Sequence, residues 1–358
     1  MRGAKYSNSV DKEFSQALQH RVDAYFRDRK LNPYADSFMI GKTLVLLGAY
    51  ISIYLLIILS GISSLPVLFF LWALLGLGQS FVGMSIMHDT VHGAYTKNKL
   101  LRYFLQLPII AIGVESKIWR IEHNVLHHTY PNVEGIDQDI HPRGIFRFTK
   151  YQQRKWYHAY QHIYASCFYS LLIIEWLTVK DFFKAIKYYR MQFFKSRIET
   201  AVVILIVLLK KLIFYFIFLY IPLRVLPFET VLVVAMFITM LLVAGLSMTI
   251  VFQLAHVITG CETENDILNL SQKNWHVHQL ETTSDFAHGN YLLSYLIGGL
   301  NYQIEHHLFP RICHVYYPAI SIIIKQTANE FGFPYHYRAS FADAVKAHYS
   351  LLKQLGRE

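Results

Sequence analysis

The chain has 358 residues, of which 54% are hydrophobic and 16% charged, and its mean hydropathy is +0.28. These values exclude a disordered chain and argue against a two-domain soluble protein, so we expect an integral membrane protein. The net charge of +10 does not require nucleic acid, because membrane proteins gather Lys and Arg on the cytoplasmic side. Three cysteines without paired spacing indicate neither a disulfide framework nor a thiolate site, whereas eighteen histidines have no explanation in membrane apolarity.

The first third of the chain predicts a basic leader and one membrane hairpin. Residues 1–42 are rich in Lys and Arg and lack an apolar signal core, so we expect a cytosolic N-terminal segment. Residues 43–87 contain no charged residue. As one helix they would reach roughly 67 Å, about twice the ~30 Å hydrocarbon core, so the run must fold back. Turn residues at 61–66 divide it into predicted transmembrane helices near 43–61 and 66–87.

Two apolar stretches in the middle of the chain are predicted to lie at the membrane surface. Residues 100–112 are too short to span and contain Pro108, which favours an interfacial or re-entrant piece. Residues 156–177 are rich in Tyr and Trp and indicate an amphipathic helix along the inner surface. His158 and His162 lie four apart there, but their aromatic neighbours favour an interfacial helix over a metal site.

A second hairpin follows. Residues 230–256 contain no Lys, Arg, Asp or Glu and predict a crossing over 230–255. The preceding apolar run is interrupted by Lys210 and Lys211, each of which would cost ~2.5–3.5 kcal/mol at the bilayer centre. We therefore place both lysines at the cytosolic boundary, with their ammonium groups snorkelling to water, and the crossing at 207–223.

These runs predict an all-α integral membrane protein with four transmembrane helices in two hairpins and a cytosolic helical cap. Both termini are cytosolic, because Arg224 is the only Lys or Arg on the outer loops and the other 33 of 34 lie inside. The membrane domain covers 43–320, and 321–358 form a cytosolic C-terminal segment. We favour the bacterial inner membrane over the endoplasmic reticulum.

Histidines gather in three short clusters with helical spacing and at the end of the fourth crossing. The members are His88 and His92; His123, His127 and His128; Gln303, His306 and His307; and His256. Residues four apart project from one helix face, which suits two ligands of one metal ion. The topology derived from apolar runs and charge places all four groups on the cytosolic side. We therefore expect one shared metal site.

Eight imidazoles exceed what one ion uses, since structural zinc takes four ligands and catalytic zinc three. They suit two ions with open positions, with Gln303 nearby. Imidazole binds iron, copper and zinc, so the ligand type alone does not select the metal. Metal-bound imidazoles usually donate their other N–H to a carboxylate or carbonyl. Candidates for such support are Asp89, Asp137, Asp139, His278, Asn301 and Glu305, although capping or surface roles fit these carboxylates equally well.

At these clusters the sequence resembles the membrane fatty acid desaturase family. The resemblance rests on HDTVH at 88–92, HNVLHHTYPN at 123–132 and QIEHHLFP at 303–310, preceded by GGLNY at 298–302. The third cluster is the most specific and resembles the front-end desaturases (delta-5, delta-6 and linoleoyl-CoA desaturase-like), which act between an existing double bond and the carboxyl end. The resemblance covers about residues 35–320.

This resemblance implies a diiron enzyme that uses O2 and two electrons to remove two hydrogens from the acyl chain of an acyl-CoA or acyl-lipid. It implies that all eight clustered histidines bind iron, while Gln303, where many relatives carry histidine, binds iron directly or through water. Many eukaryotic members carry a fused cytochrome b5 domain with a His-Pro-Gly-Gly motif, which HPRG at 141–144 does not match. We therefore expect a separate electron donor, a ferredoxin or a cytochrome b5 with its reductase, docking on the basic face.

Other functions fit parts of the sequence. A diiron hydroxylase, or an enzyme of sphingolipid chains, would use the same clusters. A zinc hydrolase would want His-Glu-x-x-His, whereas the first cluster has Asp89. A metal transporter, the remote alternative, would hold its ligands near the midplane of the crossings, whereas these lie at cytosolic ends.

Overall fold

The computed structural model describes residues 5–106, 113–138, 140 and 144–358. Within these ranges, four helices are long and apolar enough to cross a membrane, which confirms the predicted fold class. They are α2 (Ser37–Leu59); α3 (Leu65–Val82), continuing through a π-helical turn (Gly83–Met87) into α4 (His88–His92); α10 (Arg197–Tyr215), continuing through another π-helical turn (Phe216–Tyr220) into α11 (Ile221–Val225); and α12 (Thr230–His256). The chain is a multi-pass membrane protein.

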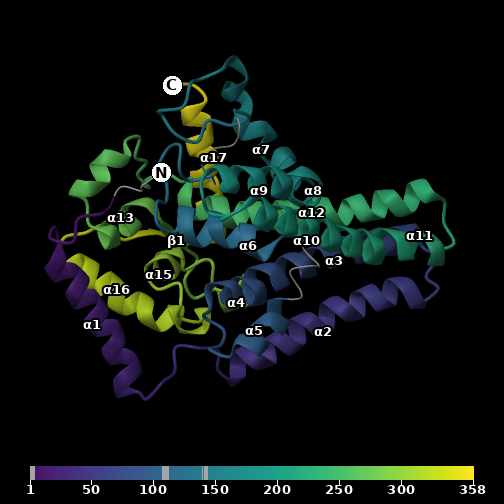
Figure 1. The fold of residues 1–358 in the computed structure, drawn as a ribbon, viewed down its shortest axis with the longest axis horizontal. Coiled ribbons are helices and arrows are strands. Elements are labelled where there is room, and N and C mark those ends of the chain that lie inside the picture. The colour runs from purple at the N-terminus through teal and green to yellow at the C-terminus, as the bar shows by residue number, and fades with distance from the viewer. Residues whose placement is uncertain (1–4, 107–112, 139, 141–143) are drawn as a thin grey trace.

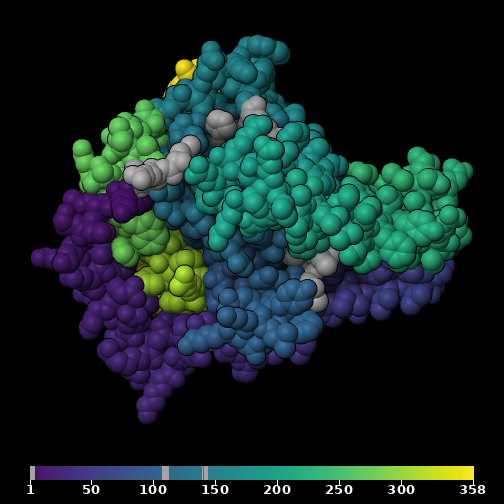
Figure 2. All heavy atoms as spheres, in the orientation of Figure 1, coloured from purple at the N-terminus to yellow at the C-terminus, as the bar shows by residue number. Residues whose placement is uncertain are grey.

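The spans form two hairpins that lie side by side and project from a cap, as Figures 1 and 2 show. α2 packs on α3, and α3 packs along α12. A Cβ added at Gly76 in α3 would lie 2.4 Å from the carbonyl oxygen of Met240 in α12. Small residues let membrane helices approach closely in this way. Outward-facing side chains such as Leu44 and Leu59 are exposed, which suits contact with lipid.

The prediction for the third span was wrong in one respect. The helix begins at Arg197, before the predicted crossing at 207–223, and its two lysines pair with carboxylates where the prediction had them snorkel to water. Lys211 is 4% exposed, and its Nζ lies 3.3 Å from a carboxylate oxygen of Asp181. Lys210 pairs with Glu115. Because carboxylates of neighbouring segments neutralise both ammonium groups inside the protein, the helix continues past them.

The stretch predicted as one surface helix is instead a bent series of short helices. It contains a 3-10 turn (Trp156–Tyr160), α7 (Gln161–Ser170), α8 (Leu172–Glu175), a π-helical turn (Trp176–Lys180) and α9 (Asp181–Arg190), with a bend of 53° at the break after Ser170. α7 and α8 pack against α12, and Tyr169, Ile173 and Trp176 are buried. The apolar side chains therefore face the protein as well as the membrane.

The predicted interfacial piece is partly described, since residues 107–112 lie outside the described ranges. Its first part is α5 (Lys99–Gln106), a short helix without any buried residue. Leu100, Leu101, Tyr103 and Phe104 are all exposed on it. An exposed apolar surface on a helix too short to span agrees with a place at the membrane interface.

The remaining elements build the cap, which also holds the C-terminus (Figure 1). They are α1 (Lys12–Asp28), α6 (Ser116–Trp119), a π-helical segment (Arg120–His127), a 3-10 turn (Ile267–Gln272), α13 (Trp275–Thr282), β1 (Ser284–Phe286), α14 (Tyr291–Leu296), α15 (Gln303–Leu308), a 3-10 turn (His314–Tyr316), α16 (Tyr317–Glu330), β2 (His336–Arg338) and α17 (Phe341–Leu355). β1 and β2 form a parallel two-stranded sheet that the all-α prediction missed. Three-residue strands are too short to show a period-two pattern.

Candidate metal centre

The eight predicted histidines meet inside the protein, where the cap joins the spans. They come from α4, from the π-helical segment 120–127 with the following residue His128, from the end of α12, and from α15. None of them is more than 9% exposed. Two groups have ligand atoms within 4.8 Å of one another: His88, His92, His123 and His306 in the first, and His127, His256 and His307 in the second. The ring of His128 lies between the two groups. Its centroid is 4.5 Å from the centroid of the His306 ring and 4.3 Å from that of the His307 ring.

A π-helical turn explains how the second cluster serves both groups. The backbone N–H of His128 donates to the carbonyl oxygen of His123, an i→i+5 bond. This wider turn returns His128 to the side of the helix that carries His123, while His127 faces the second group. The helical spacing predicted a reach to two ions but not this turn. π-helical turns are rare and occur frequently at functional sites.

Ring nitrogens point into the space between the histidines. Nε2 of His123 lies 3.3 Å from Nε2 of His88 and 3.2 Å from Nε2 of His128. Metal–imidazole bonds of about 2.0–2.1 Å place neighbouring ligand nitrogens roughly 3 Å apart, so this spacing suits a shared ion. Nε2 of His306 and Nε2 of His307 are buried and have no hydrogen-bond partner among the described residues. Buried polar atoms normally have one, so the residues present fit a metal.

Burial also keeps these rings neutral. It lowers the pKa of His123, His128, His306 and His307 well below the usual range, and the neighbouring imidazoles lower it further. A neutral imidazole offers a lone pair to a metal, whereas an imidazolium does not. The site is therefore ready to bind cations without first losing protons.

Two histidines have a carboxylate or carbonyl partner at the outer nitrogen, and one of these partners, Asp137, is a residue that the sequence suggested. His127 Nδ1 donates to a carboxylate oxygen of Asp137 at 3.0 Å, and the same oxygen accepts the backbone N–H of Asn132 at 2.9 Å. His256 Nδ1 lies 3.2 Å from the carbonyl oxygen of Thr282. Such bonds fix the ring orientation and leave Nε2 for the metal.

Two further partners were missed by sequence reasoning. Gln279 in α13 accepts Nδ1–H of His307 with its side-chain oxygen at 2.9 Å. The Tyr317 hydroxyl lies 3.1 Å from Nδ1 of His306. Both side chains are buried, at 0% and 1% exposure. No spacing marked either residue, because they reach the site only through tertiary packing.

The other suggested supports that the structure describes have hydrogen bonds to other residues. Asp89 has one oxygen 4.0 Å from Nδ1 of His88, but its side-chain hydrogen bonds come from Cys313 and His314. Asn301 and His278 bond to backbone carbonyl oxygens, of Ala287 and Pro131 respectively. Glu305 accepts from the Tyr335 hydroxyl, and His158 contacts the carbonyl oxygen of Gly144. Asp139 lies outside the described residues.

Residues 63–339 match the family profile described as fatty acid desaturase. The chain belongs to the fatty acid desaturase family. It is similar to an acyl-lipid (8-3)-desaturase of Physcomitrium patens, with 34% identity over 98% of this chain and 73% of the relative. It is also similar to two sn-1 linoleoyl-lipid 6-desaturases. The one of Arthrospira platensis is 35% identical over 96% of this chain and 92% of the relative, and that of Synechocystis sp. is 29% identical over 96% of each. The chain is therefore a membrane desaturase of the front-end type.

In this desaturase a cavity of about 600 Å³ opens beside the first histidine group. Its inner wall contains His123 and Trp119, whose rings stack with centroids 4.3 Å apart. Apolar side chains line much of the rest, including Phe146, Phe148, Phe168, Leu172, Trp176 and Phe252. An apolar chain in this cavity would lie against the His123 ring.

One side of the cavity is charged. Lys180 and Lys184 both pair with Glu122, the residue before His123. Burial raises the pKa of Glu122, but the two lysines outweigh it and bring the pKa to about 2, so the carboxylate is charged. Lys187 donates to the side-chain oxygen of Gln138 at 2.8 Å. Apolar and charged walls together match a molecule with a polar head and an apolar chain.

Gln303 lies one helical turn before His306 and His307 in α15, so its side chain shares their face. It is 2% exposed, and its side-chain oxygen has no hydrogen-bond partner among the described residues. That oxygen is a possible additional ligand.

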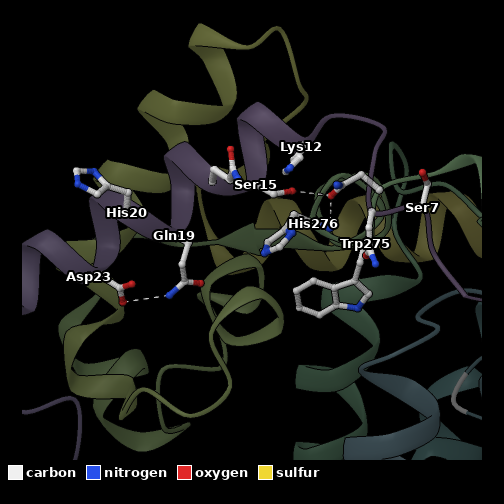
Figure 3. A pocket seen from close by; sticks show the side chains of 11 residues that line it. Ser7, Lys12, Ser15, Gln19, His20, Asp23, Trp275 and His276 are labelled. Atoms are coloured by element: carbon white, nitrogen blue, oxygen red, sulfur yellow. Dashed lines mark hydrogen bonds between the residues drawn. The ribbon is translucent and has the colours of Figure 1, made fainter.

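A second pocket, of about 520 Å³, lies between α1 and α13 on the cap (Figure 3). Its lining includes Gln19 and Asp23, which are hydrogen bonded, and Ser15, which donates to Asn274. None of the eight clustered histidines lines it. The desaturase chemistry therefore belongs to the first cavity.

Proposed function

We propose that this desaturase introduces a cis double bond into a fatty acyl chain, on the carboxyl side of an existing double bond, as a delta-6 or delta-5 type enzyme. The observation that carries the proposal is the pair of histidine groups beside an apolar cavity with one charged wall. The similarity to an acyl-lipid desaturase and to a linoleoyl-lipid desaturase favours a lipid-linked acyl chain over acyl-CoA.

We assign two irons to the histidine groups, with His128 between them and Gln303 as a further ligand, direct or through water. When bound, the irons would activate O2, which is the oxidant. The acyl chain loses two hydrogens as one carbon–carbon bond becomes double. With two electrons from the donor and two protons, O2 becomes two waters. An all-imidazole site adds no negative charge, which favours acceptance of electrons.

The protein residues have three tasks in this proposal. The apolar wall orients the chain and excludes water from the reacting carbons. Trp119 fixes the His123 ring by stacking, while Asp137, Gln279 and Tyr317 hold the outer nitrogens of other histidines. The charged wall at Glu122 holds the polar end of the substrate close to His123. Reaction near the carboxyl end of the chain follows from this short separation.

The proposal extends to the placement of the chain. Residues 1–42 and 321–358 are cytosolic segments around a membrane domain at 43–320, in a bacterial inner membrane. A ferredoxin or a cytochrome b5 with its reductase delivers the electrons at the cytosolic face. The surplus of Lys and Arg supports both the orientation and an acidic donor.

The test is expression in a host that lacks the activity, fed with linoleic acid and supplied with an electron donor. We expect a new polyunsaturated fatty acid whose added double bond lies on the carboxyl side, located by gas chromatography and mass spectrometry. The His306→Ala variant, expressed at the same level, should give none. Unchanged lipids with several fed acids would contradict the proposal, and a hydroxylated product would show a hydroxylase. Metal analysis should find about two irons per chain, whereas one zinc would favour a hydrolase.

A further inference from the structure

A chain of buried polar side chains lies behind the first histidine cluster. It begins at Lys42 in the second turn of α2, which is only 2% exposed. Lys42 Nζ lies 2.8 Å from Nε2 of His314, and Nδ1 of His314 lies 2.7 Å from Oδ2 of Asp89. Asp89 is the neighbour of His88 in α4. These three side chains therefore join a membrane span to a histidine of the metal centre.

The lysine decides the direction of these hydrogen bonds. An ammonium group has only donors, so Lys42 donates to Nε2 of His314. The ring proton of a neutral His314 then sits on Nδ1 and is donated to Asp89. The thiol of Cys313, at 3.2 Å, and the backbone N–H of His314, at 3.3 Å, also donate to Oδ2 of Asp89. One carboxylate oxygen is thus fully occupied by this side of the protein.

The other carboxylate oxygen faces the metal centre. Oδ1 of Asp89 lies 4.0 Å from Nδ1 of His88, while Nε2 of His88 lies 3.3 Å from Nε2 of His123. A carboxylate beside Nδ1 favours the tautomer that keeps the proton there and leaves Nε2 bare for the metal. At 4.0 Å this contact is longer than a hydrogen bond, so Asp89 acts through its negative charge, which favours Nε2 as the nitrogen that His88 offers.

We propose that Lys42 and His314 are positioning residues for His88, acting through Asp89. The inference rests on the proposed dimetal centre. An apolar residue would anchor α2 at lower cost than a charged lysine in a membrane span. The positive charge of Lys42 offsets the negative charge of Asp89. The His314 ring lies between them and holds the carboxylate in its orientation. Breaking such a buried arrangement at one end leaves the remaining charge uncompensated.

The test measures metal binding and not turnover. Metal-free full-length protein in detergent is titrated with Co(II) against a competing chelator, and the Co(II) absorption spectrum is recorded. Lys42→Met should weaken one of the two bound ions about 10–100-fold, the range for outer partners of metal-bound histidines, and leave the other unchanged. Lys42→Arg keeps the charge and should restore most of the affinity. His314→Phe should lose affinity as Lys42→Met does.

A double-mutant cycle separates positioning from a general structural role. In an Asp89→Asn background, Lys42→Met should weaken binding no further, because its effect passes through the carboxylate. Lys211→Met is the matched control, since Lys211 is also buried in a span but pairs with Asp181 away from the histidines. It should lower thermal stability without changing Co(II) affinity.

Equal Co(II) affinity in Lys42→Met and the unmodified protein would overturn the inference. So would a loss that persists in full in the Asp89→Asn background. If Lys42→Met does not fold, His314→Phe is compared in the same two backgrounds. An unmodified protein that binds fewer than two ions would refute the dimetal centre itself, which distinguishes that failure from failure of the Lys42 inference.

Discussion

Gln279 offers a direct test of the metal centre, because its side-chain oxygen has a single hydrogen-bond partner among the described residues, the His307 ring. Its side-chain oxygen accepts Nδ1–H of His307 at 2.9 Å, and the side chain is completely buried. In Gln279→Leu the side chain keeps a similar size, but the N–H of His307 loses its acceptor. A buried donor left unpaired costs about 1–3 kcal/mol.

The size of the expected effect follows from the position of that bond. Losing an outer partner of a metal-bound histidine typically lowers metal affinity 10–100-fold, or about 1.4–2.7 kcal/mol. The cost of leaving the N–H unpaired is of the same size. We therefore expect the His307 ring to rotate toward another acceptor, which moves its Nε2 away from the metal. We expect weaker binding of the ion held by His127, His256 and His307. The ion at the His88 group should bind as before.

The assay is a Co(II) titration of the metal-free protein against a chelator, with thermal unfolding measured in parallel. Gln161→Leu is the control, because Gln161 is equally buried and bonds to the backbone of Arg147 and Leu352, away from the histidines. It should lose stability without losing Co(II) affinity. The reasoning fails if Gln279→Leu binds both ions normally, or if Gln161→Leu loses as much affinity.

Three further changes test other parts of the structure. Tyr317→Phe removes the hydroxyl at Nδ1 of His306 and should weaken the other ion about 10-fold in the same titration. Leu172→Trp fills part of the cavity and should abolish conversion of fed linoleic acid, measured by gas chromatography, while the iron content stays constant. Gly76→Ala places a methyl group against the backbone of α12 and should lower the free energy of unfolding in detergent by about 1–3 kcal/mol. Gly48→Ala, which has open space around it, should leave that free energy unchanged. Equal stabilities of the two variants would contradict the close crossing of α3 and α12.

The spans were predictable because apolar length has a direct physical meaning in a bilayer. Uncharged runs located three of the helices, with ends that differ from the observed ones by up to six residues. The third failed at Lys210 and Lys211, where the local rule assumes that a charged side chain must reach water. The carboxylates of Glu115 and Asp181 that neutralise them lie far away in the sequence. No local pattern reveals such pairs, because the fold brings them together.

The same division applies to the metal centre. The histidines carry a spacing signal and share one side of the membrane, so the sequence indicates all eight that the structure brings together. Gln279 and Tyr317 carry no spacing signal and were missed. Asp89 was selected for its place in the first cluster, yet its side-chain hydrogen bonds come from Cys313 and His314 and not from a clustered histidine. Proximity in sequence identifies candidates, while packing decides which atom each one meets.

The glycine pair before the third cluster shows how the clusters reach one another. Gly298 and Gly299 both adopt φ of +67°, a backbone conformation that side chains disfavour. A Cβ at Gly298 would lie 2.3 Å from the carbonyl oxygen of Met84, in the π-helical turn that precedes the first cluster. A Cβ at Gly299 would lie 2.9 Å from His314, which holds Asp89. The loop that leads into the third cluster thus packs directly on the turn and the side chain that orient the first cluster. Histidines more than two hundred residues apart in sequence, such as His88 and His306, come together in one group where this contact has room for backbone alone.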